Sequence, residues 1–523
     1  MRTSRVPGSA LAALVVFLSS GPAWAAERVI RLEEALRLAL EHDEAIVIQR
    51  EALAAADAGV EGAAGAYDLR FSVEAGWREG RLPVNSAFSG APEGRLAPNA
   101  ETTEATIGLE QLLPTGGTLG LRAFGDRATT DGRFEPLSPA YETRLGLELR
   151  QPLLRNRAID AARLGVRVAA SDRAGAGAGL ETTLAATVAG VESAYWTLVA
   201  AQREIAVREQ AVRLAEEQLA ETEARIGTGA APETEIAQPR AELERRQGEL
   251  FASREAAIRA ESALKLLVLG DGEPELWVDR LVPEESLEVT VKPVDLGAAM
   301  ARALEARPEL AAFEAAVERR RAEAALARDA VRPALDAVVS YDRYGLAGDA
   351  NPAAEPGAGA GSLGGGLGDS FDGLADGDFD DTRVALLLSL PLGNRSARAG
   401  AAVAASAERQ AAAELARARK TIRAEVLDAA AALETAGQRI EAARSAREAA
   451  EVQLESERIR YGSGLSTNFL VLTRQNDLSR ARLDEIAAQS DYRRAETELA
   501  RVTGTLLADR GVETAPGREP QAR

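Results

Sequence analysis

Residues 184–226 read LAATVAGVESAYWTLVAAQREIAVREQAVRLAEEQLAETEARI. The apolar residues of this stretch step by four, three, four and three positions and then by seven, at Leu184, Val188, Val191, Tyr195, Leu198, Ile205, Val212, Leu219 and Ile226. An apolar repeat of about 3.5 residues is the seam of a coiled coil. The stretch therefore predicts one very long helix that packs along its length against partner helices.

The same seam recurs in the second half of the chain, at Val426, Leu433, Ile440, Leu454 and Tyr461, and Arg447 interrupts it where the first half has Val212. Residues 32–77 align without gaps to 296–341, and residues 225–229 align to 460–464. The chain is therefore two copies of one pattern. We expect first helices at 30–66 and 295–331, long helices at 156–226 and 396–460, and return helices at 233–267 and 467–506. A helix of about 70 residues is about 105 Å long, which suits a rod or a tunnel wall.

Short alternating segments precede each long helix. Apolar side chains alternate with polar ones at Phe71 to Trp77 and Leu145 to Leu149, and again at Leu335 to Tyr341 and Val384 to Leu390. Such alternation is typical of outer-membrane strands that face lipid on one side and water on the other. A half-buried soluble sheet gives the same pattern. An N-terminal export signal at residues 1–25 and the long helices favour the membrane interpretation.

Four strands are too few to close a barrel, because about eight is the usual minimum. Open sheet edges are not tolerated in lipid. Three chains with four strands each would give twelve. A further hairpin at 105–124 either adds two strands per chain or lies outside the membrane, and the sequence does not decide between these. The Gly- and Asp-rich residues 344–381 are expected to form a flexible external loop.

The N-terminus has the pattern of an export signal. Arg2 and Arg5 precede a short apolar run, and Ala23-Trp24-Ala25 is a cleavage site, so residues 1–25 are expected to be removed. After residue 25 no membrane-spanning helix is expected. The expected divisions are a first repeat at 26–269, a connector at 270–294 that holds at most a short strand, a second repeat at 295–508, and a disordered tail at 509–523.

The composition excludes several functions. The chain has no cysteine, one histidine and a formal net charge of −19. Cysteine-based metal sites and thiol chemistry are excluded, and His-based catalytic triads are not expected. The negative charge argues against nucleic-acid binding. We therefore expect neither an enzyme nor a cofactor or metal site.

The ordered set of motifs resembles the TolC-like outer-membrane factor family. The first matching feature is the duplication of the chain into two halves. The matching motifs are Gln151-Pro152-Leu153-Leu154-Arg155, Ala194-Tyr195-Trp196, and Tyr461 to Thr467 followed by Val471-Leu472. The resemblance implies a mainly α fold with a membrane β-barrel portion: a homotrimer whose barrel continues into a periplasmic α-helical coiled-coil tunnel. It also implies partners, namely a periplasmic adaptor protein, an inner-membrane pump of the RND or ABC type, and outer-membrane lipid.

The resemblance places the glycine turns at the periplasmic tip of the tunnel. The expected adaptor contacts are Gly227, Gly229, Tyr461, Gly462, Gly464 and Ser466. Family members often carry aspartates after the second turn, where this chain has Leu470 and Thr473. The residues considered for lining the aperture are Glu233, Glu235, Asn468, Thr473 and Asp477. A plain turn at the glycines, and solvated acids at a helix start, are the alternatives.

The predicted function is therefore a passive exit duct of a tripartite efflux or type I secretion system, located in the outer membrane and reaching into the periplasm. A periplasmic coiled-coil scaffold and a stand-alone porin are the alternatives. A porin does not require helices of this length. The sequence identifies neither the exported substrate nor the type of pump.

Overall fold

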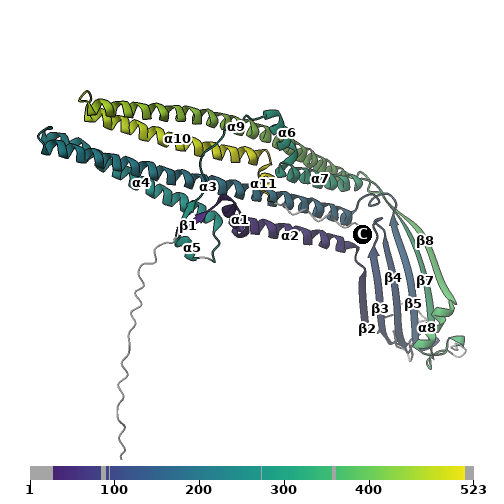
Figure 1. Ribbon diagram of the computed structural model, residues 1–523. Coiled ribbons are helices and arrows are strands. Elements are labelled where there is room, and N and C mark those ends of the chain that lie inside the picture. Colours follow the sequence, from purple (N-terminus) through teal and green to yellow (C-terminus); the bar gives the residue numbers. More distant parts are fainter. Residues whose placement is uncertain (1–26, 84–89, 93–94, 273, 356–360, 513–523) are drawn as a thin grey trace, which may run out of the picture. The chain divides into compact units, whose positions relative to one another are not determined.

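The computed structural model describes residues 27–512, except 84–89, 93–94, 273 and 356–360 (Figure 1). The predicted signal peptide and the end of the tail beyond residue 512 lie outside the described residues. The chain forms two compact units, and neither follows a single repeat. One unit contains residues up to 44, 184–296 and 427–512, and the other contains 45–183 and 297–426. Both units are thus assembled from segments of both repeats.

The second unit is built on a six-stranded sheet in the order β2-β3-β4-β5-β7-β8. All neighbouring strands are antiparallel. The strands are β2 (Arg70–Gly80), β3 (Ala100–Leu112), β4 (Thr118–Thr130), β5 (Leu137–Pro152), β7 (Ala334–Ala350) and β8 (Phe379–Ser389). The hairpin left undecided by the sequence is therefore part of the sheet, as β3 and β4. The count of four strands per chain, and of twelve in a trimer, is corrected to six per chain.

The Gly- and Asp-rich segment is more ordered than expected. β7 continues to Ala350, and the segment then contains η4 (Gly361–Leu363) and α8 (Leu367–Asp376). Helix α8 packs against β7 and β5. The buried Thr143 hydroxyl lies 2.9 Å from the Ser370 hydroxyl and donates to the Ser370 carbonyl oxygen at 3.1 Å. The expectation of a flexible loop over 344–381 was wrong where it covered these elements, because long-range contacts order them.

Each predicted first helix is divided into two. The first repeat has α1 (Leu32–His42) and α2 (Glu44–Ala64), and the second has α6 (Leu296–Ala306) and α7 (Pro308–Asp329). Arg307 is extended, with ψ at 118°, because the ring of a following proline disfavours helical backbone. Asp43 is also extended, and its carboxylate accepts a hydrogen bond from Thr187 at 2.8 Å. The expectation of continuous helices at 30–66 and 295–331 is corrected.

The long helices agree with the seam. Helix α3 (Ala161–Gly227) has 67 residues and α9 (Arg395–Gly462) has 68. The return helices are α4 (Ala237–Val268), preceded by η3 (Glu233–Ile236), and α10 (Asn468–Val502). In the first unit, Val188, Val191, Tyr195 and Leu198 have no exposed surface and belong to one apolar cluster with Leu264 of α4. The seam is therefore the core of this unit, as predicted.

The connector and the tail complete the first unit. Strand β6 (Arg280–Pro283) pairs in parallel with β1 (Glu27–Ile30), and α5 (Pro274–Val278) precedes it. A short strand in the connector is thus confirmed. After α11 (Leu506–Asp509), Arg510 donates a hydrogen bond to the fully buried Glu192 at 3.1 Å. The expectation of a disordered tail is therefore wrong for residues 509–512.

Among the described residues one helix, α3, contains an 18-residue window that is apolar enough to cross a membrane, and half of that window is buried within the structure. The expectation of no such stretch after residue 25 is corrected. Packing accounts for this apolar character, because α3 supplies Val188, Val191 and Leu198 to the buried cluster.

Candidate functional site

The two faces of the sheet differ in chemistry. The cross-strand register places Phe71, Leu109, Leu121, Leu147 and Tyr341 on one face. All six strands contribute an apolar segment to that face. Its apolar side chains include Phe71, Val73, Ala75, Trp77, Ala105, Ile107, Leu109, Leu119, Leu121, Ala123, Leu145, Leu147, Leu149, Leu335, Ala337, Val339, Tyr341, Val384, Leu386 and Leu388. Beyond these segments the same face carries charged side chains, including Glu79, Glu101, Arg127, Arg343 and Asp380. Leu386 and Leu388 are each 68% exposed in the single chain, so no described segment of the chain covers this part of the face.

The opposite face carries charges. Its ionisable side chains include Arg70, Glu74, Arg78, Glu104, Glu110, Arg122, Asp126, Glu142, Arg144, Glu148, Arg150, Asp336, Asp342, Asp381 and Arg383. Some of these form ion pairs across neighbouring strands, as Arg150 does with Asp336 at 2.6 Å and Arg144 with Asp342 at 3.6 Å. An exposed apolar face opposite a charged face matches strands that separate lipid from a water-filled lumen.

Both helical hairpins turn through the same backbone motif. Gly229 has φ at 75° and Gly464 has φ at 74°. In the first turn the Ala230 amide donates to the Arg225 carbonyl at 2.8 Å, and the Leu465 amide donates to the Arg460 carbonyl at 2.8 Å in the second. This is a Schellman cap, which needs a left-handed residue that glycine adopts without steric cost. Gly227 and Gly462 are instead the last residues of α3 and α9.

The side chains around these turns connect the two hairpins. The Arg225 guanidinium donates to the Tyr461 hydroxyl and lies 5.4 Å from the centre of the Tyr461 ring. The Ser466 hydroxyl donates to the Glu457 carboxylate within the second hairpin. Leu465 is 73% exposed at the turn. The surface of the tip therefore includes glycine backbone and an exposed leucine, together with exposed Thr228, Ala230 and Ser463, while Tyr461 and Ser466 are half-buried.

The residues considered for the aperture are spread over two elements. Glu233 and Glu235 are exposed on η3. Asp477 pairs with Arg474 at 3.0 Å on α10, and the Thr473 hydroxyl donates to the Phe469 carbonyl at 2.8 Å. The amide oxygen of Asn468 is buried without a hydrogen-bond partner among the described residues. Two of these five residues thus lie on η3 and three lie on α10.

A charged cluster that sequence reasoning missed joins the two return helices. Arg246 of α4 is 2% exposed and donates to Glu242 at 2.8 Å and to Asn476 of α10 at 3.1 Å. Arg245 also donates to Asn476, at 2.8 Å. Burial opposes ionisation of Glu242, but the hydrogen bonds from both arginines outweigh it and lower the Glu242 pKa. Glu242 and Asn476 are far apart in sequence, so no periodicity could have identified this pairing.

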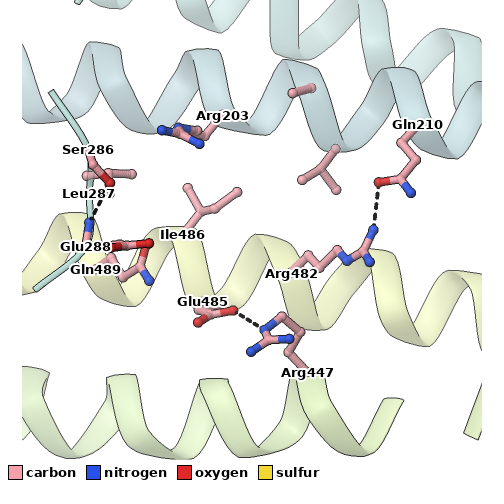
Figure 2. Close-up of a pocket in the computed structure, with 12 residues that line it drawn as sticks. Arg203, Gln210, Ser286, Leu287, Glu288, Arg447, Arg482, Glu485, Ile486 and Gln489 are labelled. Atoms are coloured by element: carbon pink, nitrogen blue, oxygen red, sulfur yellow. Dashed lines mark hydrogen bonds and ion pairs between the residues drawn. The ribbon is translucent and has the colours of Figure 1, made fainter. Parts of the chain in front are cut away.

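A second polar joint surrounds a cavity of about 360 Å³ in the same unit (Figure 2). Arg447, which interrupts the second seam, donates to Glu485 of α10 at 2.6 Å. Arg482 of α10 donates to Gln210 of α3 at 2.7 Å. Residues 286–288 of the connector line the cavity on another side (Figure 2). Where Arg447 interrupts the seam, ion pairs between helices thus replace apolar packing.

The structure has no group of three or more His, Asp or Glu side chains placed to hold a metal ion among the residues that it describes. The aspartates near α8 and β8, including Asp376 and Asp380, therefore do not form such a group. The candidate functional features of the described chain are the two sheet faces, the two tips and the joints between helices.

The chain is similar to known outer-membrane proteins. Residues 299–505 match the family model "Outer membrane efflux protein". The Campylobacter jejuni CmeC outer membrane channel shares 15% identity, with a TM-score of 0.61 over 91% of this chain and 86% of CmeC. Vibrio cholerae VceC shares 18% identity, with a TM-score of 0.61 over 90% of this chain and 96% of VceC. A membrane protein from Pseudomonas aeruginosa shares 19% identity, with a TM-score of 0.63 over 90% of each chain.

The fold is that of a TolC-like outer-membrane factor. The resemblance expected from the motifs is confirmed by the family match in the second repeat and by structural similarity over nine tenths of the chain. No curated protein matches the sequence. The mainly helical TolC-like architecture with a sheet is likewise confirmed, whereas the roles predicted for individual tip and aperture residues stay predictions.

Proposed function

We propose that this chain is the outer-membrane exit duct of an efflux or type I secretion system. It is a passive conduit located in the outer membrane, and a periplasmic adaptor and an inner-membrane pump of the RND or ABC type supply coupling and energy. The observation that carries this function is the sheet, whose exposed apolar face suits lipid and whose charged face suits a water-filled lumen. The TolC-like fold supports the same assignment.

The duct is a homotrimer. Six strands are fewer than the about eight needed for the smallest closed barrels. An open edge leaves backbone groups without hydrogen bonds in lipid, at a cost of several kcal/mol for each group. Several copies must therefore share one barrel, and three is the number that the TolC-like family implies.

Membrane insertion is tested with two neighbouring leucines. Leu386 belongs to the apolar face, and Leu387 belongs to the charged face of the same strand. Leu386→Arg places a charge in lipid, at a cost of about 2–4 kcal/mol near the midplane, whereas Leu387→Arg places the charge in water. We expect wild type and Leu387→Arg to need detergent for extraction and to conduct ions in planar bilayers, and Leu386→Arg to lose both properties.

The scaffold alternative predicts the opposite. A wild-type protein recovered in the soluble periplasmic fraction, with no conductance in bilayers, would rule out the duct. Equal behaviour of Leu386→Arg and Leu387→Arg would remove the assignment of the two sheet faces.

The tip is proposed as the adaptor contact. Its exposed surface includes Gly227, Gly229, Gly462 and Gly464 with Leu465, and the half-buried Tyr461 and Ser466 hold the turn in place. We expect Leu465→Asp to keep full conductance but to lose co-purification with the adaptor of the same export system. Val403→Asp is the matched control, because Val403 is 70% exposed and lies far from the tip along α9. Equal adaptor binding by both variants would contradict the proposal.

Glu233 and Glu235 are proposed to line the aperture, with Asn468, Thr473 and Asp477 as the other candidates. In a trimer each carboxylate occurs three times, and such a ring favours cations. We expect the double variant Glu233→Gln/Glu235→Gln to lose cation preference in reversal-potential measurements. Asp477→Asn should have less effect, because Arg474 already pairs with that carboxylate. An unchanged reversal potential in the double variant would assign these acids to the solvated helix start.

A further inference from the structure

Strands β2 and β8 are the two edges of the sheet. Each has 11 residues, and neither pairs on its outer side with another strand among the described residues. We propose that β2 of one copy pairs along its full length with β8 of the next, so that three copies close one barrel of eighteen strands. The number of copies rests on the proposed function, whereas the partner edge and its register come from the sheet itself.

Strand direction and face both permit this pairing. All neighbouring strands of the sheet are antiparallel, so the first and the sixth run in opposite directions and can continue the same pattern. The apolar face holds odd-numbered residues of β2, such as Phe71, and even-numbered residues of β8, such as Leu388. Opposite residues must point to the same face. Only registers that place odd residues of β2 opposite even residues of β8 are therefore allowed.

The stagger between neighbouring strands limits which of these registers between β2 and β8 is possible. A line perpendicular to the strands that starts at Arg70 passes through Glu110, Gly120, Glu148, Ser340 and Arg383. Arg383 lies six residues before Ser389, the end of β8. If the two edges pair in full, Arg70 of one copy lies opposite Ser389 of the next. A perpendicular line around the barrel is then displaced along the strands by these six residues for each chain that it crosses. In three chains this gives a strand tilt of about 35°, within the range of about 35–45° seen in membrane barrels.

The neighbouring registers fit less well. Shifting the pairing by two residues in one direction lowers the tilt to about 25°, which is outside that range. The opposite shift gives about 43°, but it places Arg78 directly opposite Arg383 on the charged face. Like charges at such positions are destabilising. Full pairing instead places Arg78 opposite Asp381, with Glu74 diagonal to Arg383.

The sheet already uses such pairs within one chain. On the same charged face, Arg70 of β2 faces Glu110 of β3 at 3.8 Å, and Arg150 and Asp336 are diagonal neighbours at 2.6 Å. The junction between copies thus repeats the pattern of the junctions within one copy. Eighteen strands at this tilt give a backbone radius of about 17 Å, against about 12 Å for twelve strands. A barrel of this size leaves an aqueous lumen.

The absence of cysteine in the chain allows a direct test by disulfide formation. Full pairing places Ser72 of one copy opposite Leu387 of the next, both on the charged face. Directly opposite residues have their Cβ atoms within disulfide range. Three double variants share Ser72→Cys and differ in the partner, which is Ala385→Cys, Leu387→Cys or Ser389→Cys. Each is oxidised in the membrane and separated by non-reducing electrophoresis, beside the four single-cysteine variants.

We expect Ser72→Cys/Leu387→Cys to give covalent dimers and trimers that disappear on reduction, at least tenfold faster than either shifted pair. The single-cysteine variants should give no covalent dimers or trimers in the same electrophoresis. Native mass spectrometry of the reduced variants and strand counting by electron cryo-microscopy are run in parallel. We expect three copies and eighteen strands.

Failure of this proposal and failure of the proposed function give different results. A conducting trimer that shows no covalent ladder, a faster reaction for a shifted pair, or twelve strands would overturn the pairing while leaving the duct in place. A non-conducting protein with no trimer would overturn both.

Discussion

The two repeats build their helical cores with tyrosines on opposite helices. When the repeats are aligned at the tip turns, Tyr195 of α3 corresponds to Ala430 of α9, and Tyr492 of α10 corresponds to Ala257 of α4. Both tyrosines and both alanines are buried. The Tyr195 hydroxyl donates to the Ile30 carbonyl at 3.1 Å, and the Tyr492 hydroxyl accepts from the Lys292 amide at 3.2 Å. Both repeats thus bury one tyrosine and one alanine, and in both the tyrosine hydroxyl forms a hydrogen bond to the backbone just before the first helix. The repeats differ in which helix carries the tyrosine.

The repeats differ more in the sheet. Residues 71–77 of β2 align with 335–341 of β7, and 143–152 of β5 with 382–391, which include most of β8. In the second repeat the two strands are direct neighbours, whereas in the first repeat β3 and β4 separate them. An inserted antiparallel hairpin widens a sheet without disturbing its flanking strands, because it fits between two strands that were already antiparallel.

The largest effect is expected where the first repeat buries a charge and the second does not. Glu192 is fully buried, and it corresponds to Leu427, which is 45% exposed. Arg510 and Thr497 donate hydrogen bonds to Glu192. Arg510→Ala leaves a buried carboxylate without its counter-charge and should lower the free energy of unfolding by about 3 kcal/mol, measured by urea unfolding in detergent.

A rescue variant isolates this interaction. In a Glu192→Leu background, which introduces the residue of the second repeat, Arg510→Ala should have much less effect on the urea midpoint. An equally large loss in that background would mean that Arg510 acts through packing and not through the buried charge.

The tip turns should respond alike in both repeats. Gly229 and Gly464 both have left-handed backbone, with open space where a Cβ would lie. Gly229→Ala and Gly464→Ala should each lower the free energy of unfolding of the hairpin by about 1–2 kcal/mol, because L-residues are strained in this region. Hydrogen exchange of the tip amides measures the loss. Gly227→Ala and Gly462→Ala are matched controls at helical positions, and they should be neutral or slightly stabilising. Unequal effects in the two repeats would contradict the equivalence of the turns.

The two tyrosine hydroxyls should contribute similar free energies although they lie on opposite helices. Tyr195→Phe and Tyr492→Phe each remove one hydrogen bond to the backbone and should cost about 1 kcal/mol. Thermal unfolding by circular dichroism measures both. If one variant unfolds at the same temperature as wild type, only the other repeat depends on its tyrosine hydrogen bond.

The smallest effect concerns pH at the joint between the return helices. The Glu242 pKa is lowered in the folded protein because hydrogen bonds from Arg245 and Arg246 outweigh the effect of burial. A lowered pKa stabilises the folded state above the unfolded value of about 4.3, and this stabilisation is lost as pH falls through the folded pKa. Wild type should therefore be more stable than Glu242→Gln at pH 7, and the difference should shrink below about pH 4. A difference that is constant from pH 7 to pH 3 would exclude ionisation of Glu242 as its source.

Local periodicity predicted most of the elements. The seam from Leu184 to Ile226 placed the end of α3 within one residue of Gly227, and alternation identified the residues of β2, β5, β7 and β8 that belong to the apolar face. The sequence also indicates where the first helix of the second repeat divides, because Pro308 stands at the break. The first repeat has no proline at its break, and Asp43 is held there by Thr187, which is distant in sequence.

Contacts between distant residues could not be predicted in this way. Arg246 with Asn476, Arg510 with Glu192 and Ser370 with Thr143 involve residues far apart in the chain, and no local pattern marks the partner. The predicted tip residues lie at the turns, as the glycines suggested, whereas their contact with an adaptor and the lining of the aperture stay predictions.

By itself the sequence determined the duplicated order of elements, the coiled-coil seams, the alternation of the strands and the two glycine turns, because each follows from a repeat or a backbone preference within a few residues. The tertiary structure decided that the sheet has six strands, that its edges are β2 and β8, and which charges meet across helices. Strand neighbours and ion pairs depend on the free energy of bringing distant segments together, and that free energy is not encoded in any single stretch of the chain.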